Sequence, residues 1–277
     1  TIMIPDVLPL LRHKNSDNFF LIAGPCIVEN PQMPLEIASV IYDICERLEI
    51  PFIFKASYKK ANRTSIHSFT GIGDILALKA IADVRNELRI PVLTDFHTAE
   101  EAELAAAYVD VLQVPAFLCR QTELLVAAAL TQKVINVKKG QFISPEAMQF
   151  VVEKLKSQGN NRIILTERGT TFGYNDLIVD FRSIPIMQSF DVPVVVDITH
   201  SLQQPNTSAG VSGGSPQFIS TIGKAAVAAS ADGIFIETHP EPSRALSDGA
   251  NMLQLSLLEN LLKQLVQIRK ALNRNYS

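Results

Sequence analysis

The segment VLTDFHTAEEAELAAAYVDVLQVPAFLCRQTELLVAAALTQKVINVK, residues 92–138, shows the alternation that runs through the whole chain. Three short apolar runs, at 92–94, 111–114 and 134–137, are separated by stretches with helical periodicity such as 121–130. Continuous apolar runs of this length are typical of strands covered on both faces. Thr98 with Glu101 three residues later forms a capping box, which marks the start of a helix. The segment therefore predicts strands that alternate with helices.

The same alternation continues on both sides of this segment. Further apolar runs lie at 19–23, 52–55, 163–166, 194–197 and 233–236, and apolar residues recur at helical spacing in 35–48, 75–88, 145–156 and 216–229. Ser144 before Pro145 indicates a helix that begins at residue 145. Eight strands alternating with helices predict the α/β class, as a single (β/α)8 TIM barrel over 1–277 with 1–18 as a short N-terminal extension. The first crossover lacks the glycine motif of a dinucleotide-binding sheet.

Composition excludes several classes of protein. The chain has 277 residues, of which 47% are hydrophobic, and this is enough to bury the core of one large domain. A net charge of −3 without a basic field argues against a nucleic-acid partner. Three scattered cysteines favour a reduced, cytoplasmic protein over a disulfide scaffold. No apolar stretch approaches the roughly 18 residues of a membrane span, so we expect a soluble protein with no membrane partner and no targeting segment.

Polar side chains end or follow nearly every predicted strand. They are Cys26, Lys55, Asp95, Gln113, Lys138, Arg168, His200 and Glu237. In a barrel of parallel strands the active site lies at the carboxyl ends of the strands, so these residues predict one common site. The long connections 167–187 and 200–216 are expected to be lids, substrate contacts or interface pieces.

Four of the polar residues suit a divalent metal ion. Cys26, His200, Glu237 and Asp248 offer one thiolate, one imidazole and two carboxylates, and barrel closure would make the first and last strands neighbours. Fe²⁺, Zn²⁺ and Mn²⁺ are the candidate ions. Each residue alone also has a structural explanation, because a cysteine is often a buried small hydrophobe and a loop aspartate often bonds its own backbone.

The cations indicate an anionic substrate. Lys55 and Lys138 directly continue apolar strands, where a lysine is desolvated unless an anion accompanies it. A phosphate group carries about −1.5 to −2 charge. Together with Lys60 and Arg168, these lysines exceed what one phosphate requires, and this predicts a polyanionic substrate or two phosphorylated ones. Gln113 is a candidate for substrate recognition or, equally, for bonding within the barrel.

Several long segments resemble one enzyme family. They are AGPC (23–26), KANRTSIHSF (60–69), PAFLCRQT (115–122), NVKKGQF (136–142), LTERGTTFGYNDLIVDFRSIPIM (165–187), ETHPEP (237–242) and ALSDG (245–249). Together they resemble the 3-deoxy-D-manno-octulosonate 8-phosphate synthase family, also called 2-dehydro-3-deoxyphosphooctonate aldolase. The resemblance implies a (β/α)8 barrel, usually a homotetramer. It also implies condensation of phosphoenolpyruvate with D-arabinose 5-phosphate, releasing phosphate, on the route to the Kdo sugar of lipopolysaccharide.

The resemblance also implies individual roles. It makes Cys26, His200, Glu237 and Asp248 the metal ligands, with Cys26 marking the metal-dependent branch. It assigns phosphoenolpyruvate to Lys55, Ser57, Lys60, Gln113, Lys138 and Arg168, and arabinose 5-phosphate to Asn62, Arg63 and Thr64. It places Asp95 between the two substrates, and the residues expected to act in catalysis are Cys26, His200, Asp95 and Lys138.

Three other functions are compatible with parts of this pattern. The sibling 3-deoxy-D-arabino-heptulosonate 7-phosphate synthase, which uses erythrose 4-phosphate, shares the AGPC, ERG and SDG elements, but it has a shorter KPRTS motif where this chain has KANRTS. A metal-dependent hydrolase would use His200, Glu237 and Asp248 and would leave the cations without a role. A non-catalytic sugar-phosphate binding module would need the cations but not Cys26.

Overall fold

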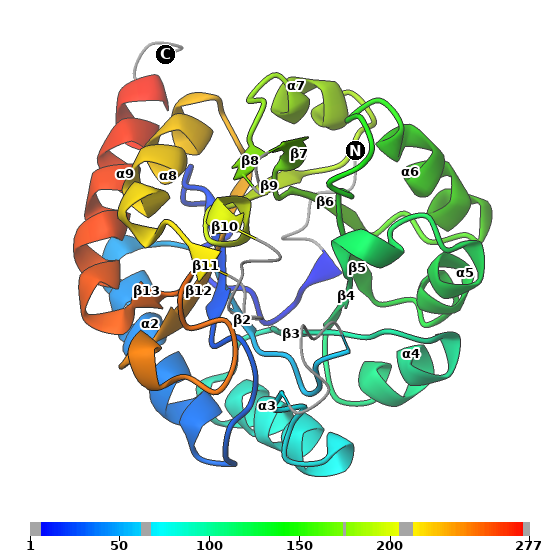
Figure 1. Cartoon of the computed structure of the whole chain (residues 1–277), viewed down its shortest axis with the longest axis horizontal. Helices are drawn as coiled ribbons and strands as arrows, with labels where there is room; N and C mark the ends of the chain where they lie inside the picture. The colour runs from blue at the N-terminus through cyan, green and yellow to red at the C-terminus, as the bar shows by residue number, and fades with distance from the viewer. Residues whose placement is uncertain (1–6, 62–67, 174–175, 205–212, 274–277) are drawn as a thin grey trace.

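The computed structural model describes residues 7–61, 68–173, 176–204 and 213–273. Its centre is a barrel of eight parallel strands, formed by β1 (Phe20–Gly24), β2 (Phe52–Lys55), β3 (Val92–Asp95), β4 (Val111–Val114), β5 (Val134–Lys138), β6 (Ile163–Glu167), β9 (Val194–Asp197) and β12 (Gly233–His239). Pairing of β1 with β12, from Phe20 opposite Gly233 to Gly24 opposite Glu237, closes the barrel. The predicted (β/α)8 TIM barrel is confirmed (Figure 1).

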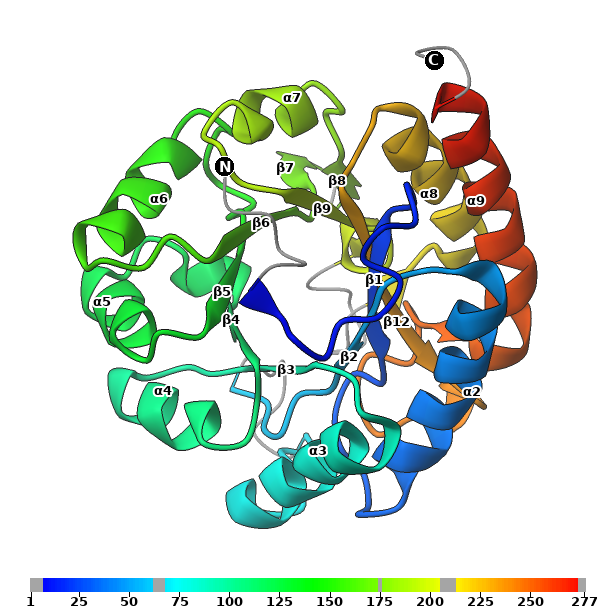
Figure 2. The same cartoon turned by 180° about the vertical axis from the view of Figure 1, so that it is seen from behind.

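Helices surround the barrel on its outer side, as both views show (Figures 1 and 2). They are α2 (Met33–Leu48), α3 (Asp74–Leu88), α4 (Ala99–Ala106), α5 (Thr122–Leu130), α6 (Met148–Ser157), α7 (Ser183–Gln188), α8 (Ile219–Ala228) and α9 (Leu258–Asn273). Short 3-10 helices are η1 (Ala116–Leu118), η2 (His200–Leu202), η3 (Pro216–Phe218), η4 (Pro242–Arg244) and η5 (Leu255–Leu257). Within the described part of the chain, no helix is long and apolar enough to cross a membrane.

Two predicted helix starts need comment. The helix predicted from Pro145 begins at Met148 instead, because the Ala147 and Met148 N–H groups bond three residues back and form a tighter turn. The Thr98 hydroxyl caps α4 by accepting from the Glu101 N–H at 3.4 Å, as predicted. The Glu101 carboxylate, however, accepts from the His97 N–H at 2.9 Å rather than closing a reciprocal box.

Alternation along the strands creates two buried layers. Outward side chains pack against the helices in one large core. Inward side chains, including Ile22, Leu93 and Phe235, form a second cluster that also contains Leu8 and Leu11 of the N-terminal segment. This segment therefore fills the amino-terminal end of the barrel (Figure 2). The opposite end, where the strands terminate, is called the mouth below.

The long connections carry small accessory strands. β7 (Thr170–Gly173) and β8 (Asp176–Ile178) form an antiparallel pair after β6, and β10 (Gln203–Gln204) pairs with β11 (Gly213–Gly214) after β9. β13 (Leu253–Gln254) pairs in parallel with the end of β12. The β7–β8 and β10–β11 pairs lie in the two connections that the sequence indicated as lids, substrate contacts or interface pieces.

Candidate active site

The predicted polar residues gather at the mouth. Cys26 and Arg168 follow their strands, Lys55, Asp95 and Lys138 end theirs, Gln113 lies within β4, and Glu237 lies within β12. Each of these side chains is buried. Asn62, Arg63 and Thr64 lie outside the described residues, so the structure does not bear on their predicted role.

Local pairing positions Cys26. Beyond the named strands, Ile27 pairs with Ser57, and the Ser57 N–H donates to the Cys26 carbonyl at 3.3 Å. Gly24 allows β1 and β2 to approach at this point, since a Cβ there would lie 1.9 Å from the Lys55 carbonyl oxygen. The extended pairing carries the Cys26 side chain into the mouth.

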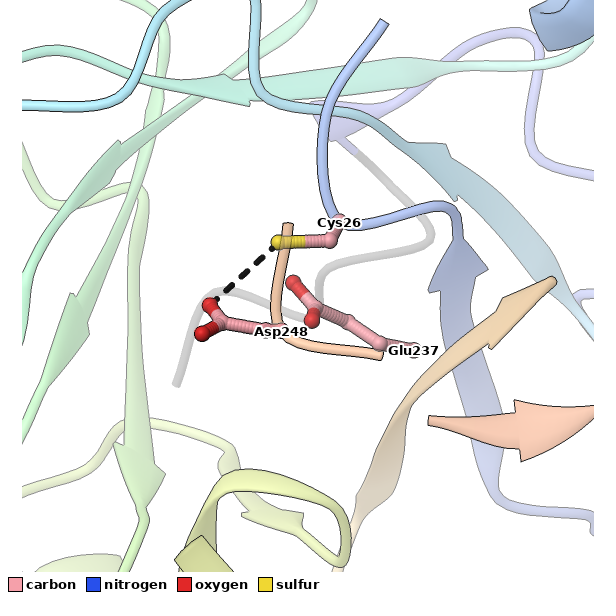
Figure 3. A group of neighbouring side chains, drawn as sticks. All are labelled: Cys26, Glu237 and Asp248. Carbon is pink, nitrogen blue, oxygen red and sulfur yellow. Dashed lines mark hydrogen bonds between the residues drawn. The ribbon is translucent and has the colours of Figure 1, made fainter. Parts of the chain in front are cut away.

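A thiol and two carboxylates converge there. One ligand atom each from Cys26, Glu237 and Asp248 lies within 4.8 Å of the other two. Figure 3 shows the three side chains pointing toward one another, with Cys26 Sγ 3.4 Å from Asp248 Oδ2. Asp248 has a left-handed backbone with φ of 48°, which is uncommon outside glycine. These three residues form what we call the ligand group.

His200 lies beside the ligand group rather than inside it. Its Nε2 is 3.4 Å from Glu237 Oε2, and its Nδ1 is 2.7 Å from Asp197 Oδ2. The structure thus brings three of the four predicted metal ligands together and places the fourth against one of them.

The donor set fits a divalent ion. Burial raises the pKa of the Cys26 thiol, and the charge of Glu237 raises it further, so the thiol is protonated at neutral pH without a cation. Burial alone would raise the pKa of Glu237, but His200 and Lys55 outweigh it and lower the value to about 2. A thiolate ligand forms when a metal displaces its proton, and a thiolate with carboxylates suits borderline-soft ions.

The buried lysines already have internal partners. Lys55 Nζ lies 2.5 Å from Glu237 Oε1, and Lys138 Nζ lies 2.6 Å from Asp197 Oδ2. The expectation that a substrate anion must accompany these lysines therefore needs correction, because carboxylates of the chain neutralise them. Sequence reasoning missed Asp197 as a functional residue. The sequence pattern could have identified it, since Asp197 ends the VVVD run three residues before His200, as the other predicted site residues end their strands.

Other donors at the mouth are less completely paired. Arg168 Nη2 donates to Gln203 Oε1 at 3.0 Å, but Nη1 is buried without a hydrogen-bond partner among the described residues. Burial lowers the pKa of Arg168 despite nearby carboxylates. Ser57 Oγ is likewise buried and unpaired within the described ranges. Lys60 Nζ is 3.9 Å from Asp248 Oδ2, its ion-pair partner. A buried unpaired guanidinium nitrogen is costly unless a ligand meets it.

Gln113 belongs to a polar ladder across the barrel. Its Oε1 accepts from Asn136 Nδ2 at 3.0 Å, and Asn136 Oδ1 accepts from the Thr166 hydroxyl at 2.7 Å. Bonding within the barrel, the structural alternative for Gln113, is therefore present. The ladder fixes the side chain through its oxygen.

Asp95 pairs with a histidine from the next turn. Its Oδ2 is 3.4 Å from His97 Nε2, and its Oδ1 is buried with no partner in the described part of the chain. Burial alone would raise the pKa of Asp95, but His97 and Lys60 hold it well below its usual range. Asp95 is thus an ionised carboxylate with one oxygen available at the mouth.

Lys139, next to Lys138, points away from the mouth. It is fully buried, and its Nζ donates to Thr170 Oγ1 at 3.0 Å and lies 3.5 Å from Glu167 Oε1. Glu167 Oε1 also accepts from the Gly169 N–H at 2.6 Å. Lys139 and Glu167 therefore hold the turn that presents Arg168, and they lie outside the site itself.

Comparison with known proteins places this barrel and its mouth in a family. The fold and the charged site are those of a (β/α)8 barrel protein whose residues 11–274 match the model of the DAHP synthetase I family. Curated relatives are more specific. A protein of Koribacter versatilis (strain Ellin345) is 54% identical over 91% of both chains, and one of Cyanothece sp. (strain PCC 7425 / ATCC 29141) is 51% identical over 96% of this chain and 97% of its own. A third, from Syntrophobacter fumaroxidans (strain DSM 10017 / MPOB), is 49% identical over 94% of this chain and 91% of its own.

All three relatives are named 2-dehydro-3-deoxyphosphooctonate aldolase. The chain therefore belongs to the DAHP synthetase I family and, more narrowly, to the 2-dehydro-3-deoxyphosphooctonate aldolases.

Proposed function

We infer that this chain is a carbon–carbon bond-forming transferase. It condenses phosphoenolpyruvate with D-arabinose 5-phosphate and water, and it forms 3-deoxy-D-manno-octulosonate 8-phosphate and inorganic phosphate. The observation that carries this function is the similarity to 2-dehydro-3-deoxyphosphooctonate aldolases, which extends over nearly the whole chain. The product is a precursor of Kdo, the sugar of bacterial lipopolysaccharide.

Phosphoenolpyruvate would bind among the cations of the mouth. The unpaired Nη1 of Arg168 supports this assignment, because a phosphate or carboxylate oxygen would satisfy it. Lys60 would add charge, Lys138 a further N–H donor and Ser57 Oγ a hydroxyl. Asn62, Arg63 and Thr64, from the KANRTS motif, would hold the phosphate end of the aldose.

Cys26, Glu237 and Asp248, with His200 beside them, would hold a divalent ion. Fe²⁺, Zn²⁺ and Mn²⁺ all suit this set of ligands. When bound, the ion would supply Lewis-acid chemistry, either by polarising the aldehyde oxygen or by making water more acidic. The convergence of the ligand group within 4.8 Å supports the proposal.

The reaction requires charges of both signs. C3 of phosphoenolpyruvate attacks the aldehyde carbon, water adds its oxygen at C2, and the proton released by water ends on the former aldehyde oxygen. In the resulting hemiketal phosphate, the bond between C2 and the phosphate ester oxygen then breaks, and the C2 hydroxyl proton leaves with the phosphate. The ionised carboxylate of Asp95 would stabilise positive charge that develops at C2. Lys138 and Arg168 would stabilise the departing phosphate.

The sibling reaction with erythrose 4-phosphate is the alternative to exclude, because the matched family model carries the DAHP synthetase name. Phosphate release would be measured with phosphoenolpyruvate alone, with added arabinose 5-phosphate, and with added erythrose 4-phosphate. We expect release only with arabinose 5-phosphate and an eight-carbon product by mass spectrometry. Release without any aldose would instead indicate a hydrolase, and preference for erythrose 4-phosphate would indicate the sibling.

We propose further that the enzyme is a homotetramer in the cytoplasm. Exposed aromatic side chains support assembly, since Phe142 and Phe172 are 58% and 76% exposed. Three free, buried cysteines support a reducing compartment. Sedimentation equilibrium would test the tetramer, and a monomer at micromolar concentration would contradict it.

A further inference from the structure

Asp197 accepts more hydrogen bonds than its place at the end of a strand requires. It is fully buried at the end of β9. Its Oδ1 accepts from the Thr199 N–H and hydroxyl, both at 3.0 Å, and from the His200 N–H at 2.8 Å. Its Oδ2 accepts from Lys138 Nζ at 2.6 Å and His200 Nδ1 at 2.7 Å. Three bonds thus anchor one oxygen, and the second oxygen holds two functional side chains.

The contact with His200 determines what that imidazole offers to the mouth. Because Nδ1 donates to Asp197, the other nitrogen, Nε2, is the one available to a cation, and it faces Glu237 Oε2 at 3.4 Å. The same network reaches Glu237 directly, since the Thr199 hydroxyl accepts from the Glu237 N–H at 3.2 Å. Outer carboxylates of this kind orient metal-binding histidines.

The contact of Asp197 with Lys138 likewise positions one of the cations proposed to bind phosphoenolpyruvate. Lys138 Nζ lies 3.8 Å from the centre of the Phe235 ring and 3.4 Å from His200 Nδ1. The shared Oδ2 therefore sets the distance between the ammonium and the imidazole. Without this carboxylate, a buried ammonium would face a histidine N–H with no anion between them.

We propose that Asp197 is a positioning residue that joins the metal half of the site to its phosphoenolpyruvate half. This inference rests on the proposed function. Asp197 touches neither substrate in the proposal, and it acts through His200 and Lys138. Its loss should weaken binding of a divalent ion and of phosphoenolpyruvate separately, even when each is measured without the other.

Asp197→Asn is the direct test, because an amide keeps the size but cannot accept at both positions. Asp232→Asn is the matched control. Asp232 Oδ2 accepts from the Val194 N–H at 2.8 Å, at the amino end of the same strand and far from the mouth. A general effect of losing a buried carboxylate beside β9 would appear in both variants.

Two affinities would be measured for each purified variant. Mn²⁺ binding would be followed by competition with a chromophoric chelator, and phosphoenolpyruvate binding to the metal-free protein by calorimetry. For Asp197→Asn we expect Mn²⁺ affinity to fall about 10- to 100-fold and phosphoenolpyruvate affinity to fall about 10-fold or more. Asp232→Asn should keep both affinities within about twofold of wild type.

Thr199→Val keeps the result interpretable if Asp197→Asn does not fold. It removes the hydroxyl between Asp197 and Glu237 but leaves the Lys138 contact, so Mn²⁺ affinity should fall while phosphoenolpyruvate affinity stays near wild type. Unchanged affinities in a folded Asp197→Asn protein, or equal losses in the Asp232→Asn control, would overturn the inference. Failure of the proposed function is distinct, because wild type would then form no eight-carbon product.

Discussion

At the scale of single residues, Cys26 is the strongest chemical argument for a metal site. Its thiol lies in a fully desolvated position with two carboxylates close by, and these surroundings disfavour the thiolate. Lys55 and Lys60 already pair with the two carboxylates, so the thiol is the member of the group that needs a metal ion to become ionised. The same residue would be unremarkable in a helix core, as Cys45 is in α2.

Cys26→Ser should therefore remove metal-dependent activity. A hydroxyl is a much weaker ligand for borderline-soft ions than a thiolate, so we expect kcat/KM to fall by about 100-fold or more, that is about 2.7 kcal/mol. The rate of product formation would be measured after chelation and addition of Mn²⁺ or Zn²⁺. Cys119→Ala, which changes a buried thiol outside the ligand group, is the control. Full activity of Cys26→Ser would contradict a metal role for this residue.

His97 should make stability depend on pH. Burial alone would lower its pKa, but Asp95 and Glu101, each 3.4 Å away, outweigh it and raise the pKa. The folded protein then binds this proton more tightly than the unfolded chain does. His97 therefore stabilises the fold fully below its ordinary pKa of about 6.5, and this contribution is lost as pH rises through the raised value.

Urea unfolding at pH 6 and pH 8.5 measures this contribution. Wild type should lose more free energy of unfolding between the two pH values than His97→Gln does. His13, which pairs with Glu46 and has no contact with Asp95, provides a control through His13→Gln. An equal pH dependence in wild type and His97→Gln would show that this histidine does not carry the effect.

At the scale of elements, the turn from β6 to β7 presents Arg168 from a buried ion pair. Gly169 has φ of 90°, which favours glycine, and its N–H is held by Glu167. Lys139 completes the arrangement from the neighbouring strand. The position of the Arg168 guanidinium thus depends on Glu167 and Lys139, two charged residues outside the mouth.

Glu167→Gln should destabilise the fold on the order of 3 kcal/mol, because it leaves the buried ammonium of Lys139 without a counter-charge. Chemical denaturation would measure the change. Phosphoenolpyruvate affinity should fall as well, since the turn positions Arg168. The double variant Glu167→Leu with Lys139→Met, which removes both charges, should recover much of the stability. If it proves no more stable than Glu167→Gln, the ion-pair explanation is incorrect.

At the scale of the whole molecule, the two ends of the barrel have different tasks. Polar side chains converge at the mouth, whereas Leu8 and Leu11 fill the other end with apolar side chains. In this fold, residues at the amino-terminal end serve stability and residues at the carboxyl ends serve chemistry. Changes at the two ends should therefore separate stability from activity.

Leu8→Ala and Leu11→Ala test this separation. Each side chain is almost completely buried, at 2% and 3% exposed, so each substitution should cost about 2 to 4 kcal/mol of unfolding free energy. At a temperature where the variants remain folded, KM for phosphoenolpyruvate should not change. Leu257→Ala, at a site 55% exposed, is the control for a leucine outside the core. A raised KM in Leu8→Ala would mean that packing at the amino-terminal end of the barrel affects substrate binding at the mouth.

The barrel was predictable because strand burial and helix periodicity are properties of short segments. The eight apolar runs predicted the strands, and closure followed from their number, so the approach of Cys26 to Glu237 was foreseeable. The role of Asp197 was not, because it depends on which carboxylate faces Lys138 across the barrel. Bonding of Gln113 within the barrel was among the predicted alternatives, but its partners Asn136 and Thr166 were not, since the register between strands determines which polar groups meet.

Lys138 and Lys139 have a consequence for how this barrel can vary in evolution or by design. The two lysines are neighbours in sequence, but Lys138 contacts Asp197 at the mouth, whereas Lys139 contacts Glu167 outside the site. Deleting a single residue from β5 would turn Lys139 inward and Lys138 outward, so neither ammonium would keep its carboxylate partner. Length changes of one residue should therefore be tolerated in the connecting loops and selected against inside this strand.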